Sequence, residues 1–94
     1  MSQVTLKITL KKNDKTVGIK LEGRVAGPWA VELDRVWVET APQLNSRKLI
    51  LDITDVTYAD AAGLKTLRAI CAQARAHIAA SSLWTKYLAG EIQE

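Results

Sequence analysis

The first quarter of the chain alternates apolar and polar residues. Over residues 4–10 the apolar side chains fall on one face of an extended chain, at Val4, Leu6, Ile8 and Leu10. Residues 17–22 repeat this alternation with Val17, Ile19 and Leu21. A period of two predicts half-buried strands, and the Lys-Lys-Asn-Asp-Lys segment between them is rich in turn formers. The two segments therefore predict an antiparallel β-hairpin.

The next segment changes to a helical period. Pro28 suits the first turn of a helix, because its missing amide hydrogen costs no hydrogen bond there. Apolar residues then recur every three or four positions, at Ala30, Leu33, Trp37, Ala41 and Leu44. Pro42 disfavours helix in the residue before it, so we predict a helix from Pro28 to about residue 41. We expect at least one of Trp29 and Trp37 to pack on the sheet rather than form an exposed recognition surface.

A continuous apolar run marks the predicted centre of the sheet. Residues 48–54 read Lys-Leu-Ile-Leu-Asp-Ile-Thr, which is typical of a strand buried on both faces. After a loop, a second helix is predicted from its apolar stripe at Leu64, Leu67, Ile70, Cys71, Ala74 and Ile78. Residues 77–81 predict a short fourth strand, and Ser82 predicts the cap of a last helix.

The order β-β-α-β-α-β-α predicts one α/β domain over residues 1–94. We expect a small open mixed sheet of about four strands with helices packed against it and right-handed crossovers. The length fits a single core, and 48% apolar with 24% charged residues excludes a disordered composition. No apolar run approaches the ~20 residues that span a bilayer, and the N-terminus lacks a signal-peptide layout. We therefore expect a cytoplasmic protein without membrane association.

Candidate catalytic chemistry is sparse. A single cysteine, Cys71, and a single histidine, His77, disfavour a disulfide, a zinc site and a nucleophile–base pair. The glycines form no phosphate-binding loop, so we predict no enzyme and no cofactor. Asp52, Asp55 and Asp60 surround the end of the predicted central strand, where a cation could bind. Because their spacing matches no metal site, we interpret Asp60 as a helix cap and the others as local backbone acceptors.

Positive charge is concentrated at the N-terminal end. Six of the thirteen basic residues fall within residues 1–24, against two acidic ones. A basic segment can bind nucleic acid, but no aromatic residue is interleaved with these lysines to stack on bases. We therefore interpret them as a solvated strand face that protects an open sheet edge. The same edge could pair with a second copy of the chain and form a homodimer.

The start of the second predicted helix is the main functional candidate. Within the segment Thr-Tyr-Ala-Asp-Ala-Ala-Gly-Leu-Lys-Thr-Leu (57–67), Asp60 is placed to cap the helix by accepting a hydrogen bond from residue 62 or 63. Small residues follow at Ala61, Ala62 and Gly63. They leave the helix amides and the positive end of the helix dipole open to a partner. Alternatively, they are small because another part of the same chain packs there.

Residues 49–67, LILDITDVTYADAAGLKTL, resemble the signature of the anti-sigma-factor antagonist family, the STAS domain. That signature has an apolar strand ending in Asp, a short loop and Asp-Ser-Ser/Thr-Gly-Leu at the start of a helix, which Asp60, Gly63 and Leu64 match. Residues 21–33, LEGRVAGPWAVEL, resemble the family's second strand and first helix. The resemblance extends from about residue 4 to residue 80. It implies a STAS-like domain that ends before the family's last strand and helix.

The resemblance also implies a non-enzymatic signalling module that binds an anti-sigma factor or a related regulatory kinase. The implied partner-binding residues are Thr57, Tyr58, Asp60, Ala61, Ala62, Gly63 and Leu64. In the family, the partner phosphorylates the serine after the motif aspartate, and the added charge ends the interaction. Ala61 occupies that position and Ala62 the next, so we predict docking without phosphorylation at the usual place. The alternative is a small-ligand or nucleotide-binding domain that uses the same helix N-terminus.

Overall fold

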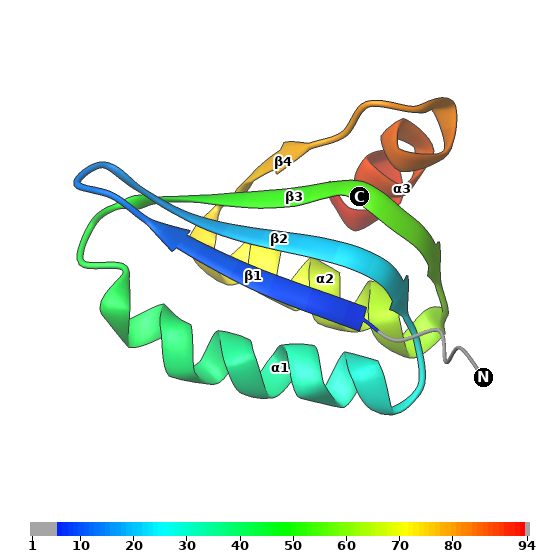
Figure 1. Ribbon diagram of the computed structural model, residues 1–94, viewed down its shortest axis with the longest axis horizontal. Helices are drawn as coiled ribbons and strands as arrows, with labels where there is room; N and C mark the ends of the chain where they lie inside the picture. Colours follow the sequence, from blue (N-terminus) through cyan, green and yellow to red (C-terminus); the bar gives the residue numbers. More distant parts are fainter. Residues whose placement is uncertain (1–5, 94) are drawn as a thin grey trace.

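The computed structural model describes residues 6–93, and its sheet and helices alternate as the sequence predicts (Figure 1). The elements are β1 (Leu6–Lys12), β2 (Thr16–Val25), α1 (Pro28–Thr40), a 3₁₀ turn η1 (Ala41–Gln43), β3 (Lys48–Ala59), α2 (Ala61–Ala74), β4 (His77–Ala79) and α3 (Leu83–Gln93). The four strands lie in the order β1-β2-β3-β4. The first pair is antiparallel and the other two are parallel. The predicted α/β fold with an open mixed sheet is confirmed.

Helices cover one face of this sheet. Figure 1 shows α1 and α2 side by side beneath the strands, as two right-handed crossovers in the same direction require. The core lies between them and the sheet, and its fully buried members include Ile19, Leu21, Leu33, Leu51, Leu67 and Ile70. On the other face of β3, Ile50, Asp52 and Thr54 are half-buried. The prediction that this strand is buried on both faces is therefore wrong.

Two bulges in β3 carry the strand past its predicted end. The pairing with β2 shifts register within residues 20–22 and again at residues 23–24, and each time β3 uses one extra residue. In a regular strand, every second side chain points to the same face of the sheet. An extra residue shifts this alternation by one, so Val56 is buried three residues after the buried Ile53.

These bulges extend β3 to Ala59, so the loop predicted between the central strand and the second helix is wrong. Thr57 and Tyr58 are strand residues instead, and both are exposed. Gly23 of β2, with φ 106°, lies at the second shift and is a local sign of it. The first shift has no such sign, since neither strand has a glycine there. As a result, the start of α2 follows directly from a hydrogen-bonded strand and is held in place by it.

The remaining element boundaries differ from prediction by a few residues. Residues 4 and 5 of the first predicted strand lie outside the described residues, and that strand continues to Lys12. The hairpin turn is correspondingly short, and the Asn13 side chain closes it by accepting hydrogen bonds from the amides of Lys15 and Thr16. β4 ends at Ala79 rather than residue 81, and Ile78 belongs to it and not to the stripe of α2.

Two predicted side-chain roles are confirmed. Trp37 is buried, and its indole Nε1 donates a hydrogen bond to Gln73 Oε1 at 2.8 Å, which joins α1 to α2. Ser82 Oγ accepts a hydrogen bond from the Thr85 amide at 3.0 Å, as expected of the cap of α3. No helix within residues 6–93 is long and apolar enough to cross a membrane.

Candidate functional site

Asp60 connects the starts of two helices. Its backbone is extended, with φ −89° and ψ −176°, which is the conformation of a helix N-cap. Carboxylate Oδ1 accepts a hydrogen bond from the Gly63 amide at 2.7 Å, inside the first turn of α2. Oδ2 accepts one from the amide of Gly27, the residue before α1, at 2.9 Å. The predicted cap is confirmed, whereas the bond to Gly27 has no sequence signal because 33 residues separate the partners.

These amides also fix the ionisation of Asp60. The hydrogen bond from Gly63 contributes most, followed by that from Gly27, and together they hold the pKa of the carboxyl below its usual value. Asp60 is therefore a carboxylate at neutral pH, with both oxygens engaged in the fold. It serves as a structural anion at the helix start rather than as a general base.

Gly63 is explained by packing within the chain. A Cβ atom at this position would lie 1.9 Å from the carbonyl oxygen of Val25, at the end of β2. No side chain fits that approach, so glycine is required where α2 passes the end of β2. Of the two explanations for the small residues, close packing therefore applies to Gly63.

Ala61 and Ala62 are different, because both are exposed on the outer side of the first turn of α2. Thr57 and Tyr58, at the end of β3, are exposed as well, and the Arg24 guanidinium lies 4.6 Å from the centre of the Tyr58 ring. Sequence reasoning missed Arg24, which reaches this region only through the β2–β3 pairing. We call Thr57, Tyr58, Ala61 and Ala62 the α2-start surface.

Leu64 completes the sequence motif but lies at the inner edge of this region. Its side chain is half-buried and packs against the core cluster. The structure thus separates the predicted site residues into two groups. Asp60, Gly63 and Leu64 build the helix start, while the α2-start surface is what another molecule can reach.

Comparison with protein-family models finds no match, and comparison with curated proteins finds none either. Solved structures do match. The crystal structure of an antisigma-factor antagonist, STAS domain from Rhodobacter sphaeroides, superposes with a TM-score of 0.62 at 11% identity, over 99% of this chain and 97% of that one. The fold is that of a STAS domain. The anti-sigma factor antagonist SpoIIAA in its unphosphorylated form gives a TM-score of 0.59 at 14% identity, over 86% and 80% of the two chains.

The fold predicted from the resemblance is therefore confirmed. Because unrelated functions share folds, the function of this chain has to be argued from its site.

Asp52, Asp55 and Asp60 do not gather into one site. Asp52 Oδ1 accepts hydrogen bonds from the Thr54 amide at 2.9 Å and from its hydroxyl at 2.7 Å, as predicted for a local backbone acceptor. Asp55 instead pairs with the Lys20 ammonium at 3.2 Å across the β2–β3 pairing. Within residues 6–93, no group of three His, Cys, Asp or Glu side chains is placed to hold a metal ion.

Cys71 and His77 lie in different surroundings. Cys71 is half-buried on α2 and packs against the core, and burial raises the pKa of its thiol. A protonated thiol is a poor nucleophile. His77 is exposed at the beginning of β4.

Proposed function

We propose that this STAS domain is a non-enzymatic signalling module that binds an anti-sigma factor or a related regulatory kinase through the α2-start surface. The observation that carries the proposal is the exposure of Ala61 and Ala62 directly after Asp60, whose carboxylate is used inside the fold. The names of the two similar structures, both anti-sigma-factor antagonists, support this assignment. We place the activity in the cytoplasm, because the single cysteine fits a reducing compartment.

The same surface lacks the usual phosphorylation switch. A phosphate needs a hydroxyl acceptor, and neither Ala61 nor Ala62 has one. Thr66, one turn further along α2, donates its hydroxyl to the Ala62 carbonyl at 3.2 Å. We infer that the partner docks persistently, because the charge that would repel it cannot be added at positions 61 and 62.

A charge placed by mutation tests the docking surface. We expect Ala61→Asp to leave the domain folded and stabilised by about 0.3–1 kcal/mol, because an acid in the first turn favours the helix dipole. Binding should nevertheless weaken at least about tenfold, since an unpaired charge would be buried at the interface. Calorimetric titration against the anti-sigma factors and kinases of the same genome measures binding, and urea denaturation measures stability.

Ala72→Asp is the matched control, because Ala72 is also an exposed alanine of α2 but lies three turns from its start. It should bind the partner as the wild type does. Equal binding by Ala61→Asp and the wild type would overturn the docking surface, and so would failure of the wild type to bind any of these proteins.

Binding of a nucleotide or small ligand at the start of α2 is the weaker alternative. The Gly63 and Gly27 amides, which a phosphate would need, already donate to Asp60. The Asp60 charge would also repel a phosphate. A rise in melting temperature with ATP or GTP that Ala61→Asp abolishes would favour this alternative over protein docking.

We also propose that the outer edge of β1 is where a homodimer would form. In the described sheet, β1 has a neighbour on one side only. Its exposed Lys7 and Lys11 disfavour pairing of two such edges, so any dimer should be weak. Light scattering across protein concentration would measure it, and a dimer that persists at micromolar concentration would contradict this expectation.

A further inference from the structure

Positive charge gathers at the end of the sheet where β3 begins. Three segments form this end: residues 11–16 around the hairpin turn, residues 44–48 before β3, and residues 75–77, which lead into β4 beside the start of β3. Figure 1 shows the hairpin turn and the loop before β3 together at the left, at the opposite end of β3 from the start of α2. The three segments contain one acidic residue, Asp14, and six basic ones. We call these six the basic end: Lys11, Lys12, Lys15, Arg47, Lys48 and Arg75.

Backbone hydrogen bonds hold the hairpin turn against the loop before β3. The Lys48 amide donates a hydrogen bond to the Lys15 carbonyl at 3.0 Å, so these two lysines adjoin. The Arg47 guanidinium donates hydrogen bonds to the carbonyls of Asn13 at 3.2 Å and of Leu44 at 3.0 Å. Arg47 therefore fastens the turn to the loop, and the cations around it have fixed relative positions.

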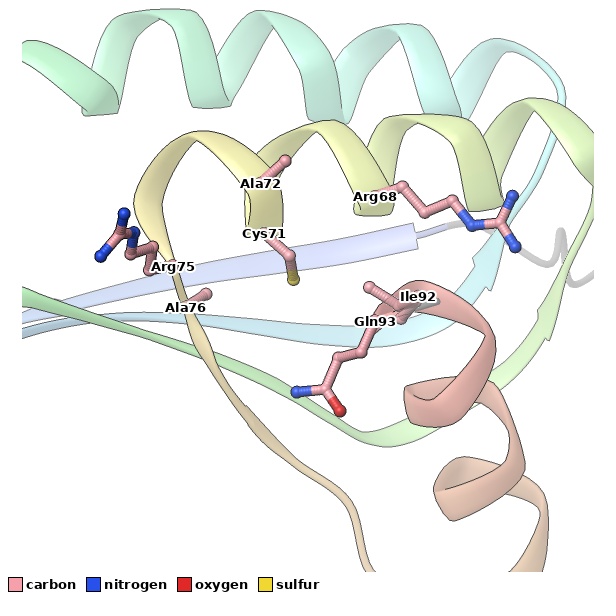
Figure 2. Close-up of a pocket in the computed structure, with 7 residues that line it drawn as sticks. All are labelled: Arg68, Cys71, Ala72, Arg75, Ala76, Ile92 and Gln93. Carbon is pink, nitrogen blue, oxygen red and sulfur yellow. The ribbon is translucent and has the colours of Figure 1, made fainter.

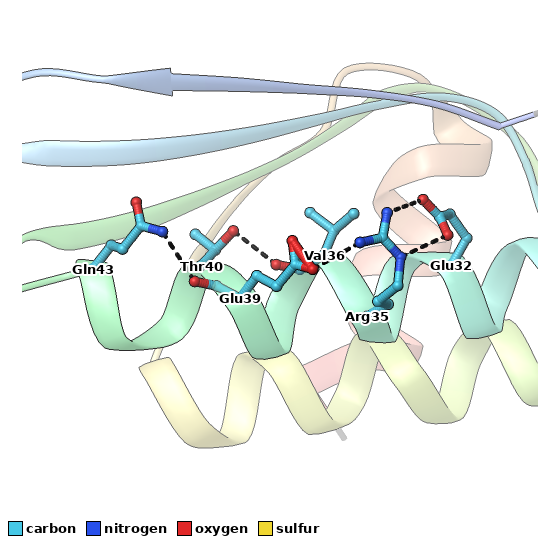
Figure 3. Close-up of polar contacts among 6 residues, drawn as sticks. All are labelled: Glu32, Arg35, Val36, Glu39, Thr40 and Gln43. Atoms are coloured by element: carbon cyan, nitrogen blue, oxygen red, sulfur yellow. Dashed lines mark hydrogen bonds and ion pairs between the residues drawn. The ribbon is translucent and has the colours of Figure 1, made fainter.

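Lys12 and Arg75 extend the basic end on the side of the helices. Lys12 Nζ donates a hydrogen bond to Gln43 Oε1. Gln43 Nε2 in turn donates one to the Glu39 carbonyl at 3.1 Å (Figure 3). Arg75 is exposed, and Figure 2 shows its guanidinium pointing outward beyond the end of α2.

These six charges form no ion pair within residues 6–93. The ion pairs there involve Lys7, Lys20 and Arg35 instead. Arg35 on α1 shows the contrast, because Glu32 and Glu39 hold its guanidinium at 2.6 and 2.7 Å (Figure 3). The charge of the basic end is thus left for another molecule to neutralise.

The structure also divides the basic residues of the first quarter of the chain, which the sequence analysis interpreted as one strand face. Lys7 and Lys20 pair with acids of the sheet, and Arg24 stacks on an aromatic ring. The other three belong to the basic end. Of these, Lys11 lines a hollow on the open face of the sheet together with Asp52, without an ion pair between them among the described residues.

The side chains around these cations are polar. Residues 12–16 read Lys-Asn-Asp-Lys-Thr and residues 45–48 read Asn-Ser-Arg-Lys, without one apolar residue. Protein interfaces depend on aromatic and apolar anchors, and helices that bind membranes insert apolar side chains. Lysine, asparagine, serine and threonine are instead typical donors to the phosphates of nucleic acids. A two-stranded β-ribbon also fits the major groove of a duplex.

We propose that the basic end binds the phosphate backbone of double-helical nucleic acid, without reading its sequence. Five side chains contact phosphates: Lys11, Lys12, Lys15, Lys48 and Arg75. Arg47 positions the turn, because backbone carbonyls occupy its guanidinium. The ligand is a duplex, because the two segments offer no aromatic side chain to stack on unpaired bases. This surface is independent of the proposed partner docking, since the α2-start surface lies at the other end of β3.

Salt dependence tests the proposal. Fluorescence anisotropy of a labelled DNA duplex of mixed sequence measures the binding constant between about 50 and 200 mM salt. We expect a dissociation constant of about 10 μM or below at the lowest salt concentration. The logarithm of the binding constant should fall linearly with the logarithm of the salt concentration. Its slope should be about −4.5, because each of five phosphates contributes about −0.9.

Variants locate the contact. Lys15→Gln and Lys48→Gln should each weaken binding and make the slope shallower by about 1. Lys65→Gln removes the same charge from an exposed position near the start of α2 and should leave the slope unchanged. Equal effects of all three variants would overturn the proposal, and so would a duplex that does not bind at the lowest salt concentration. Vesicles of phosphatidylserine and phosphatidylcholine that bind the domain as tightly as the duplex does would also overturn it.

Discussion

The starts of α1 and α2 both depend on one residue, Asp60. Its two carboxylate oxygens accept hydrogen bonds from Gly63 in α2 and from Gly27 before α1. Both bonds go to backbone amides, which are donors at any pH. The strength of the link therefore depends on whether Asp60 is ionised.

Stability should consequently fall in acid. The folded-state pKa of Asp60 is below its unfolded value of about 3.9, so its contribution is present above pH ~4 and is lost as pH drops through the folded-state pKa. Asp60→Asn should be less stable than the wild type at pH 7, with the difference shrinking toward pH 3. Urea denaturation across this range measures it.

Asp34→Asn, at an exposed position of α1, is the control and should track the wild type. A constant gap between Asp60→Asn and the wild type at every pH would contradict the role of the charge.

Among the elements, α2 and α3 each contain one glycine, in opposite surroundings. Gly63 in α2 faces the Val25 carbonyl, which leaves no space for a Cβ atom. Gly90 in α3 is exposed, and a Cβ atom there would meet nothing within 4 Å. The first glycine is required by packing between elements, whereas the second only weakens its helix.

The same substitution should therefore have opposite effects at these positions. Gly63→Ala should destabilise the domain by about 2–3 kcal/mol, because α2 has to move away from β2. Gly90→Ala should stabilise it by about 0.5–1 kcal/mol, because alanine loses less backbone entropy in a helix. Denaturation of the two variants against the wild type measures both, and a change of the same sign in both would be inconsistent with this packing.

Helix α3 contacts β3 beyond the part that pairs with the short last strand. β4 pairs with β3 only over residues 50–52. Further along, the Trp84 indole of α3 donates a hydrogen bond to the Val56 carbonyl of β3 at 2.8 Å. The exposed ring of Tyr87 stacks on Trp84, with 6.2 Å between the ring centroids.

Trp84→Phe should cost about 1 kcal/mol or more, because the Val56 carbonyl loses its donor and some packing is lost. Tyr87→Phe should stay within about 0.5 kcal/mol of the wild type, because its side chain is mostly exposed. Thermal denaturation compares the two. Equal losses would indicate that the hydrogen bond to Val56 contributes nothing.

At the scale of the whole molecule, local patterns predicted the elements and their order. Apolar residues alternate with polar ones in β1 and β2, and they recur every three or four positions in α1 and α2. Both patterns indicate which side of each element faces the core. The motif at Asp60 predicted the cap, since an N-cap is a local interaction. The resemblance over residues 49–67 then predicted the STAS fold.

What the sequence did not predict depends on contacts between distant segments. The Gly27 amide, just after β2, donates a hydrogen bond to Asp60 at the start of α2. Gly63 of α2 lies directly against the Val25 carbonyl at the end of β2. The bulges in β3 follow from its register against β2. The small size of Gly63 was consistent with close packing, and Gly23 lies at one of the bulges. The partner segment of each contact became visible only in three dimensions.

The central claim is that the domain has a docking surface without the phosphorylation switch. Introducing a hydroxyl at position 61 tests this claim most directly. Wild type and Ala61→Ser are each incubated with the anti-sigma kinase that binds the domain, with and without ATP, and phosphate and complex are measured by mass spectrometry and gel filtration. We predict that the wild type carries no phosphate at 61 or 62 and stays bound, whereas Ala61→Ser gains one phosphate and dissociates. Release of the wild type through phosphorylation elsewhere, for instance at Thr57, would contradict the claim, as would a phosphorylated Ala61→Ser variant that remains bound.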